Sequence, residues 1–341
     1  MAPRNVTGGS TARTLLDLLR GGETLSGPDI AGRLGISRAA VWKHVHRLID
    51  DGYAISSDRR DGYRLDQAPD RLLPAEIGAR LVTGRIGRTV HHRETIDSTN
   101  RLAMELARRG AAEGEVVIAE AQTGGRGRLG RSFFSPAGVS LYASMILRPP
   151  IAPAIAPEIT LVAGLAVAET VERHAGARPG LKWPNDVYLG PLKVAGILTE
   201  MESEADRVLF VVCGPGVNLN VRQDDFPPAI RGIATSILAA SGRRVDRVAF
   251  AVDLFASFEC AYDEFLDGGF AALRRRWESY SILNGREVTI EGIGAPVAGT
   301  VVGIDDHGAL RLASARGEVS RIVSGDVTLA KTSRSSRAHK T

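Results

Sequence analysis

The sequence predicts an α+β protein of several domains, and three observations support this prediction. The chain has 341 residues, a length typical of two or three domains. Hydrophobic residues make up 44% of it, which is enough to bury a sizeable core. Short helical patterns and a hairpin are followed by alternating strands and helices, and then by short strands between Gly and Asp turns. We expect domains at 1–66, 70–283 and 284–331, with a disordered basic tail at 332–341.

The positive net charge belongs to the C-terminal tail. The chain has 43 basic and 39 acidic residues, a net charge of +4. The whole excess lies within 331–341, a segment without acidic residues, at Lys331, Arg334, Arg337 and Lys340. The net charge is therefore no argument for nucleic-acid binding, which would need a local cluster of basic residues.

No segment resembles a signal peptide or a membrane span. The first residues contain no apolar run, and the most apolar stretch, 159–168, is too short to cross a bilayer. We expect a buried helix at this stretch, and a cytoplasmic protein. Cys213 and Cys260 lack the spacing of a zinc site, so we expect two buried thiols and no metal site built by the protein alone.

The first domain has the pattern of a helix-turn-helix followed by a wing. Helices are expected at 11–20, 26–34 and 37–51, with Ser26 and Ser37 as N-caps. The third helix has a stripe of apolar residues: Val41, Val45, Leu48 and Ile49. Two short strands, 53–57 and 63–65, then enclose a basic tip.

This order of elements predicts a DNA-binding module whose third helix reads the groove. The alternative is a three-helix module with solvated charges, because residues 1–66 carry only 10 basic and 8 acidic side chains. The basic tip of the wing favours DNA binding. The expected contacts are Ser37, Arg38, Lys43, His44, Arg47, Arg59 and Arg60, and Arg64 is a further candidate for a phosphate.

The most informative segment is GRGRLGR at 125–131, which places three arginines among three glycines. A dinucleotide-binding loop would lead into a helix, but the strand expected at 139–147 follows instead. Glycine allows such a loop to move, and arginine offers a fork of donors suited to carboxylate and phosphate. The segment therefore predicts a loop that closes over an anionic ligand. The alternative is a solvated surface loop.

Two lysines accompany this loop in an expected hairpin, KWPNDV at 182–187 and KVAGIL at 193–198. Lys193 begins an apolar strand, so it must be exposed or meet an anion. Lys182, Asn185 and Asp186 would lie at the same end of the sheet, where they suit a triphosphate and its Mg²⁺. Each residue alone is compatible with ordinary surface charge.

Two shorter segments complete the candidate site. Ser98, Thr99 and Asn100 lie where a strand is followed by a helix, although simple N-capping by Asp97 or Ser98 would also explain them. A strand at 208–213 enters a Gly- and Pro-containing turn that would direct Asn218 into a pocket.

Together, DSTN at 97–100, Gln122 with GRGRLGR, KWPNDV and KVAGIL resemble the family of bifunctional biotin–protein ligases and biotin operon repressors. The resemblance covers roughly residues 12–330, and GRGRxGR combined with KWPND is highly specific. It implies a winged helix-turn-helix, a central mixed α/β biotin ligase domain and a C-terminal SH3-like barrel. It also implies a biotin–[acetyl-CoA-carboxylase] ligase, which makes biotinyl-5′-AMP from biotin and Mg-ATP and transfers biotin to a lysine of a carrier protein.

The resemblance also assigns roles to residues. Biotin would be held by Ser98, Thr99, Asn100, Gln122, Arg126, Gly127, Arg128, Lys193 and Gly196. ATP would be held by Arg128, Arg131, Lys182, Asn185, Asp186 and Asn218, with Mg²⁺ near Asp186. Lys193 is the first choice for the catalytic electrostatic role, assisted by Arg128 and Lys182.

The chain departs from the family pattern at two positions, and the resemblance also implies one regulatory property. Family members often carry a Trp that stacks on adenine within 221–237, where this chain has only Phe226, and Phe133 stands where a Trp is common. The adenine-stacking residue therefore stays open. In the family the adenylate promotes dimerisation and operator binding, so the implied partners are a carrier domain, operator DNA and a second copy of the chain.

Three alternatives remain at this point. The chain could be a regulator that only senses biotin or its adenylate, or a ligase whose winged helix is structural. A related fold transfers lipoate or octanoate, but the arginine-rich GRGRLGR favours biotin.

Overall fold

The computed structural model describes residues 7–58, 62–292 and 295–329. The chain divides into two compact units, and the division falls between Arg71 and Leu72. Arg59 and Arg60, expected at the tip of the wing, and the basic tail lie outside the described residues.

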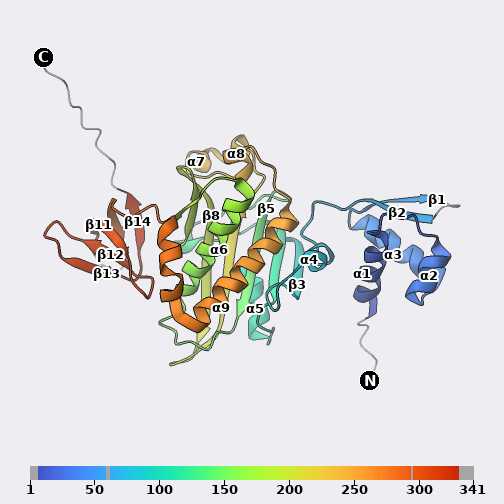
Figure 1. Cartoon of the computed structure of the whole chain (residues 1–341), viewed down its shortest axis with the longest axis horizontal. Helices are drawn as coiled ribbons and strands as arrows, with labels where there is room; N and C mark the ends of the chain where they lie inside the picture. Colours follow the sequence, from blue (N-terminus) through green and yellow to red (C-terminus); the bar gives the residue numbers. More distant parts are fainter. Residues whose placement is uncertain (1–6, 59–61, 293–294, 330–341) are drawn as a thin grey trace, which may run out of the picture. The chain divides into compact units, whose positions relative to one another are not determined.

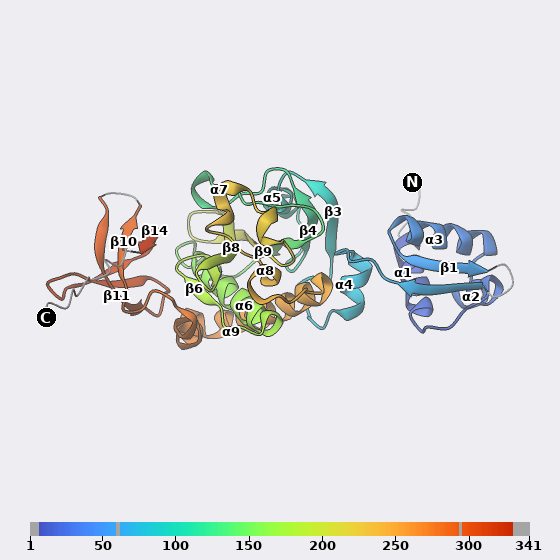
Figure 2. The same ribbon diagram turned by 90° about the horizontal axis from the view of Figure 1, so that it is seen from above.

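In its described residues the first unit has three helices and a hairpin, α1 (Thr7–Leu19), α2 (Gly27–Leu34), α3 (Arg38–Asp50), β1 (Ala54–Asp58) and β2 (Gly62–Gln67) (Figure 2). The hydroxyl groups of Ser26 and Ser37 accept the backbone N–H groups of Asp29 and Ala40, so both predicted N-caps are present. Strands β1 and β2 pair antiparallel as the expected wing. Three members of the predicted apolar stripe are buried, but Ile49 is 41% exposed because it lies at the edge of that stripe.

The second unit is built on a seven-stranded mixed sheet. Its order is β3-β4-β5-β9-β8-β7-β6, and only the β3–β4 pair is parallel. The strands are β3 (Val90–Ile96), β4 (Val116–Gln122), β5 (Ser140–Leu147), β6 (Gly180–Lys182), β7 (Asp186–Leu189), β8 (Leu192–Ser203) and β9 (Val208–Asn218).

Helices cover both faces of this sheet (Figure 1). The long helices α6 (Glu158–Ala175) and α9 (Arg247–Tyr280) share the main hydrophobic core with one face, and α5 (Thr99–Arg108) packs on the other. The stretch at 159–168 is thus the buried helix that its composition predicts. Three shorter helices complete the unit: α4 (Pro74–Arg80), α7 (Pro228–Arg231) and α8 (Ile237–Ser241).

The C-terminal strands form a second, smaller sheet. They are β10 (Glu287–Glu291), β11 (Val297–Ile304), β12 (Leu310–Ala313), β13 (Val319–Ile322) and β14 (Asp326–Leu329), in the order β13-β12-β11-β10-β14. All neighbours pair antiparallel, and within the described residues the outer strands β13 and β14 are not paired with each other. This is an open sheet, so closure into the expected barrel is not found. Its buried side chains join the core of the larger sheet.

Two local expectations are wrong. Strand β9 does not end at Cys213 but continues through Gly214, Pro215 and Gly216 to Asn218, where a turn was expected. Cys213 is buried, but Cys260 is exposed. No helix in the described part of the chain is long and apolar enough to span a membrane.

Candidate functional site

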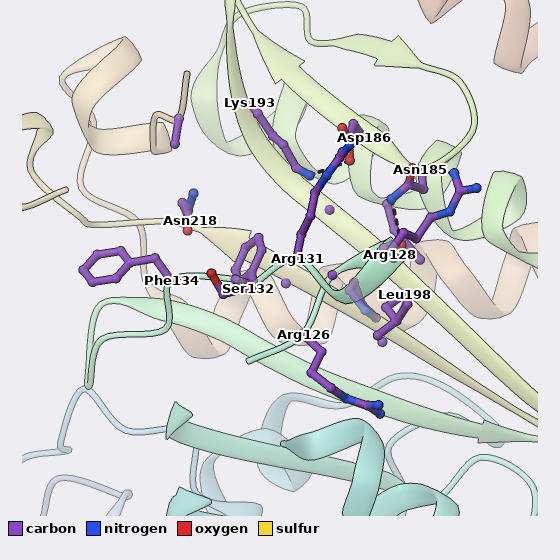
Figure 3. A pocket seen from close by; sticks show the side chains of 18 of the residues that line it. Arg126, Arg128, Arg131, Ser132, Phe134, Asn185, Asp186, Lys193, Leu198 and Asn218 are labelled. Carbon is purple, nitrogen blue, oxygen red and sulfur yellow. Dashed lines mark hydrogen bonds and ion pairs between the residues drawn. The ribbon is translucent and has the colours of Figure 1, made fainter. Parts of the chain in front are cut away.

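A cavity of about 580 Å³ lies in the second unit, between the sheet and the loop at 125–131 (Figure 3). It is lined by every residue that the sequence assigned to biotin or ATP, fourteen in all. They come from the loop, from β4, β6, β7, β8 and β9, from α5 with its N-cap Ser98, and from the turn between β6 and β7. Segments that lie far apart in the sequence therefore meet around one space.

The floor of the cavity is a polar network at the start of α5. The N–H and hydroxyl groups of Thr99 donate to Gln122 Oε1 over 2.9 and 3.1 Å. Ser144 Oγ on β5 donates to Asn100 Oδ1 over 2.6 Å. Ser98 occupies the N-cap position of α5, but its side chain makes no capping hydrogen bond. N-capping alone therefore does not account for these polar residues. Ser144 was missed because a serine within an apolar strand gives no signal of its own.

Strand β9 approaches this floor closely because the two residues that contact it, Gly214 and Gly216, have no side chains. A Cβ atom on Gly214 would lie 1.9 Å from Asn100 Oδ1, and one on Gly216 would lie 2.8 Å from the Phe133 ring. The glycines are thus required for the amide of Asn100 and the ring of Phe133 to rest against the strand. The same glycines made the strand look like a turn in the sequence.

The three arginines of the loop contact three different parts of the second unit. Arg126 makes an ion pair with Glu200 on β8, 2.8 Å, and Arg128 donates to Asn185 Oδ1, 3.2 Å. Arg131 pairs with Asp326 on β14. Figure 3 shows Arg126 directed away from Lys193 and Asp186. Between these anchors the tip of the loop, Leu129, has φ 55° and is 75% exposed.

The two lysines lie at the β7–β8 end of the cavity. Lys193 Nζ lies 2.6 Å from Asp186 Oδ1. Lys182 makes no ion pair with a described residue, and its ammonium lies 5.8 Å from the centre of the Tyr188 ring. Burial lowers the pKa of Lys182; the charge of Asp186 opposes this shift and that of Lys193 adds to it. The described lining has five cationic side chains against three carboxylates, Asp186, Glu291 and Asp326, so this cavity suits an anionic ligand.

Asn218 is buried at the end of β9, and only one side of its amide is occupied. Its Nδ2 donates to Thr235 O over 3.0 Å, whereas its buried Oδ1 has no hydrogen-bond partner among the described residues. An acceptor left unmatched in a cavity is costly unless a ligand supplies a donor. Apolar side chains line the same region: Phe226, which the sequence comparison with the family had raised, and Phe134, Ile230 and Ile233, which it had not.

The C-terminal sheet also reaches the cavity. Glu291, Asp326, Val327 and Thr328 are among the lining residues. No site residue was expected in this region, because nothing in the sequence pattern links these residues to the loop; Asp326, for example, lies 195 positions after Arg131.

In the first unit, the predicted DNA-binding residues divide between two faces of α3. Arg38, Lys43 and Arg47 are exposed, whereas His44 is half-buried on the side next to the core. Trp42 and His46, which were not among the expected contacts, are exposed instead. Ser37 is the N-cap of the helix, and Arg64 in the wing pairs with Asp66, 2.9 Å.

The comparisons with known proteins cover nearly the whole chain. Three family models match: HTH domain at residues 11–64, Biotin/lipoate A/B protein ligase family at 83–218, and Biotin protein ligase C terminal domain at 284–329. The bifunctional ligase/repressor BirA of Bacillus spizizenii is 40% identical over 309 residues, which is 91% of this chain and 95% of that protein. The protein of the same name from Escherichia coli K12 is 35% identical over 87% of this chain and 91% of its own length.

A solved structure is similar to most of the chain. The biotin protein ligase from Aquifex aeolicus in complex with biotin and ATP aligns with a TM-score of 0.63 and 29% identity. The alignment covers 72% of this chain and 100% of that chain.

Proposed function

This chain belongs to the family of bifunctional biotin ligases and repressors, and we propose that it is an ATP-dependent biotin–[acetyl-CoA-carboxylase] ligase that also represses transcription. The observation that carries the ligase proposal is the single cavity that unites a polar floor, an arginine loop and two lysines. Biotin and ATP, the two proposed substrates, are both anionic, so they need cationic donors to lie side by side.

In the first step, an oxygen of the biotin carboxylate attacks the α-phosphorus of ATP. The bond from that phosphorus to the bridging oxygen breaks, pyrophosphate leaves, and biotinyl-5′-AMP remains. Lys193 is the proposed main catalytic residue, because its ammonium is at the cavity and can exchange its carboxylate partner Asp186 for the developing charge on the phosphate. Arg128 and Lys182 would hold the same oxygens, and much of the rate would come from positioning.

Biotin would occupy the floor. The ureido group of its ring system needs both donors and acceptors, which the network of Ser98, Thr99, Asn100 and Gln122 supplies. Gly196 leaves room for close approach of the ligand, and Arg126, Gly127 and Arg128 would cover the valeryl chain when the loop closes.

ATP would lie toward β7 and β9. Lys182, Asn185 and Arg131 would meet the phosphates. The unmatched Oδ1 of Asn218 can accept a hydrogen bond from the adenine amino group, with Phe134 and Ile233 as apolar walls in place of the missing Trp. These two side chains are our candidates for the open adenine platform.

The same region suits Mg²⁺ only together with the nucleotide. Among the described residues no group of three or more His, Cys, Asp or Glu side chains forms a metal site. Mg²⁺ usually takes one or two carboxylates and keeps phosphate oxygens and water, a set that Asp186 fits. When bound there, the ion would neutralise charge on the phosphates.

In the second step, a lysine amine of a carrier-protein domain attacks the carbonyl carbon of the mixed anhydride and AMP leaves. The closed loop would keep water from the anhydride until the carrier arrives. The C-terminal sheet, which we propose is an opened form of the SH3-like barrel, would contact the carrier and complete the nucleotide side of the cavity.

The repressor proposal rests on the first unit. Its helices and wing, together with the exposed Arg38, Lys43 and Arg47, support binding to operator DNA. Arg59 and Arg60 are proposed as further contacts from the sequence alone. We propose that the adenylate-bound chain binds its operator as a homodimer.

One assay tests the ligase. The full chain is incubated with Mg-ATP, a biotin carrier domain and either biotin or lipoate, and the carrier lysine is analysed by mass spectrometry. We expect biotin on the lysine and no lipoate. Lipoate transfer would overturn the substrate, and no transfer with either acid would favour a regulator that only senses biotin.

A further inference from the structure

The exposed face of α3 carries an aromatic side chain that the proposed function has not used. Trp42 is 56% exposed, and its ring centre lies 3.8 Å from that of His46, with an angle of 35° between the planes. Single exposed apolar residues are common on protein surfaces. This one is unusual in its surroundings, because it lies on the same helix as the exposed cations Arg38, Lys43 and Arg47.

A hydrogen bond indicates which ring nitrogen of His46 carries a proton. His46 Nδ1 lies 2.9 Å from the backbone oxygen of Trp42. Because a carbonyl oxygen can only accept, Nδ1 carries the proton and donates it. In the neutral ring Nε2 is then an acceptor. With a neutral imidazole, the pair therefore presents a hydrogen-bond acceptor beside a flat apolar plate, and the contact between the two tilted rings holds their relative orientation.

This combination matches one base pair in the major groove of DNA. An A·T pair shows the adenine N6 amino group, a donor, and the thymine C5-methyl group, an apolar contact. A G·C pair shows the cytosine amino group but no methyl group. The helix that follows the turn of a helix-turn-helix enters this groove with its N-terminal residues at the base edges, and Trp42 and His46 lie in the first three turns of α3.

We propose that Trp42 and His46 read an A·T pair in the operator. His46 Nε2 accepts a hydrogen bond from the adenine amino group, and the Trp42 indole packs against the thymine methyl group. The inference rests on the proposed DNA-binding function and adds which residues specify sequence. Arg38, Lys43 and Arg47 meet phosphates, which positions the helix without reading bases.

The first test uses the full chain with biotin and Mg-ATP. A pool of duplexes with a random central segment is selected for binding, and the affinity for the enriched duplex is compared with that for a scrambled duplex. Trp42→Ala and His46→Ala should each reduce the ratio of these affinities on the order of 10-fold, because base contacts carry the discrimination. Their affinity for the scrambled duplex and their biotin transfer should stay unchanged.

Two control variants separate this effect from general weakening. Arg47→Ala should lower the affinity for both duplexes alike, since a phosphate contact is independent of sequence. His44→Ala removes the other imidazole of the same helix. The sequence suggested His44 as a DNA contact, but it is half-buried on the side next to the core, so its loss should leave the ratio unchanged. A ratio that falls in His44→Ala but not in His46→Ala would overturn the proposal.

The second test changes single atoms of the DNA. Replacing thymine by uracil at one position of the enriched duplex removes only the C5-methyl group. Replacing its adenine partner by purine removes only the N6 amino group. The first change should weaken the wild type but not Trp42→Ala, and the second should weaken the wild type but not His46→Ala. Trp42→Phe, which keeps an aromatic plate, should keep most of the response to uracil.

The outcomes distinguish this inference from the proposed function. If the wild type enriches no sequence, the repressor proposal fails and this inference fails with it. If it enriches a sequence and both alanine variants keep the wild-type ratio, the repressor stands and the inference is wrong.

Discussion

At the scale of single residues, Lys193 is central to the cavity, because it lies between its carboxylate partner and the proposed substrates. We therefore predict that adenylate formation depends on it. Lys193→Ala should reduce the rate of biotinyl-5′-AMP formation by roughly 100-fold or more, because a preorganised cation near the transferring phosphate is lost. Pyrophosphate release in a single turnover measures this step. Lys43→Ala, the same substitution in the first unit, should leave the rate unchanged, and a wild-type rate in Lys193→Ala would remove the catalytic role.

The burial of Lys182 leads us to predict that the KM for ATP depends on pH. Burial lowers the pKa of its ammonium from the ordinary 10.5, with Asp186 opposing and Lys193 adding to the shift. The side chain therefore loses its proton at lower pH than an ordinary lysine, and the KM for ATP should rise as the pH increases through the range below 10.5.

The matched variant is Lys182→Arg, because a guanidinium keeps its charge throughout this range. Its KM for ATP should stay flat where that of the wild type rises, with kcat at neutral pH as the check on geometry. Identical pH profiles of KM in the two proteins would show that another group titrates.

The residue scale also shows what the sequence can and cannot predict about the site. Lys193 was found because its charge departs from the apolar strand pattern around it, and Gln122 because it belongs to the motifs that carry the family resemblance. Phe134 and Ile233 were not, because apolar lining residues look like core residues until the chain is folded. Trp42 was missed for a related reason: helical periodicity gives the buried stripe of α3 but not which of the remaining faces is most exposed.

At the scale of elements, the loop at 125–131 is tied to three parts of the second unit by its arginines. Arg128 is the central tie, through Asn185, and it is also a proposed phosphate ligand. Arg128→Ala should therefore form the adenylate slowly and release it, so that free biotinyl-5′-AMP appears in solution during the assay. Filtration of the reaction separates free from bound adenylate. Retention equal to that of the wild type would contradict this role of the loop.

Strand β4, which leads into Gln122 and this loop, depends on a buried ion pair. Arg247 Nη1 at the start of α9 lies 2.8 Å from Glu120 Oε2, and neither side chain is more than 3% exposed. Burial alone would raise the pKa of Glu120, but hydrogen bonds from His92 and Leu72 N and the charge of Arg247 hold it at about 2.

Breaking this pair should be costly. Arg247→Met leaves the carboxylate of Glu120 buried without its cation, so it should lower the free energy of unfolding by about 3–5 kcal/mol. The double variant Glu120→Gln/Arg247→Met should lose less, because no charge stays buried. Urea unfolding measures both, and a double variant no more stable than Arg247→Met would refute the explanation by an unpaired charge.

Helices and strands were predicted well where the hydrophobic periodicity is strong. They were predicted less well where glycine and proline are compatible with either a turn or a strand. The helix at 159–168 and the β7–β8 hairpin follow from their patterns. Strand β9 was predicted to end early because Gly214, Pro215 and Gly216 favour turns. In the fold, β9 pairs with β5 at Gly216, opposite Tyr142, and again at Cys213, opposite Met145. Between these two pairs β9 and β5 are not paired, and this stretch lies beside the polar floor. Closure of the C-terminal strands could not be predicted because it depends on pairing between ends, not on local pattern.

At the scale of the whole molecule, the division between Arg71 and Leu72 separates two hydrophobic cores. We therefore predict two transitions in calorimetric unfolding, one for each unit. The proposed biotin and ATP site lies entirely in the second unit, so saturating biotin with ATP should raise only its transition. At about 100 times Kd, binding adds about 2.7 kcal/mol, which for a unit of this size corresponds to about 5–10 °C. Arg247→Met should lower that transition alone. A single transition, or an equal shift of both, would show that the two units unfold cooperatively.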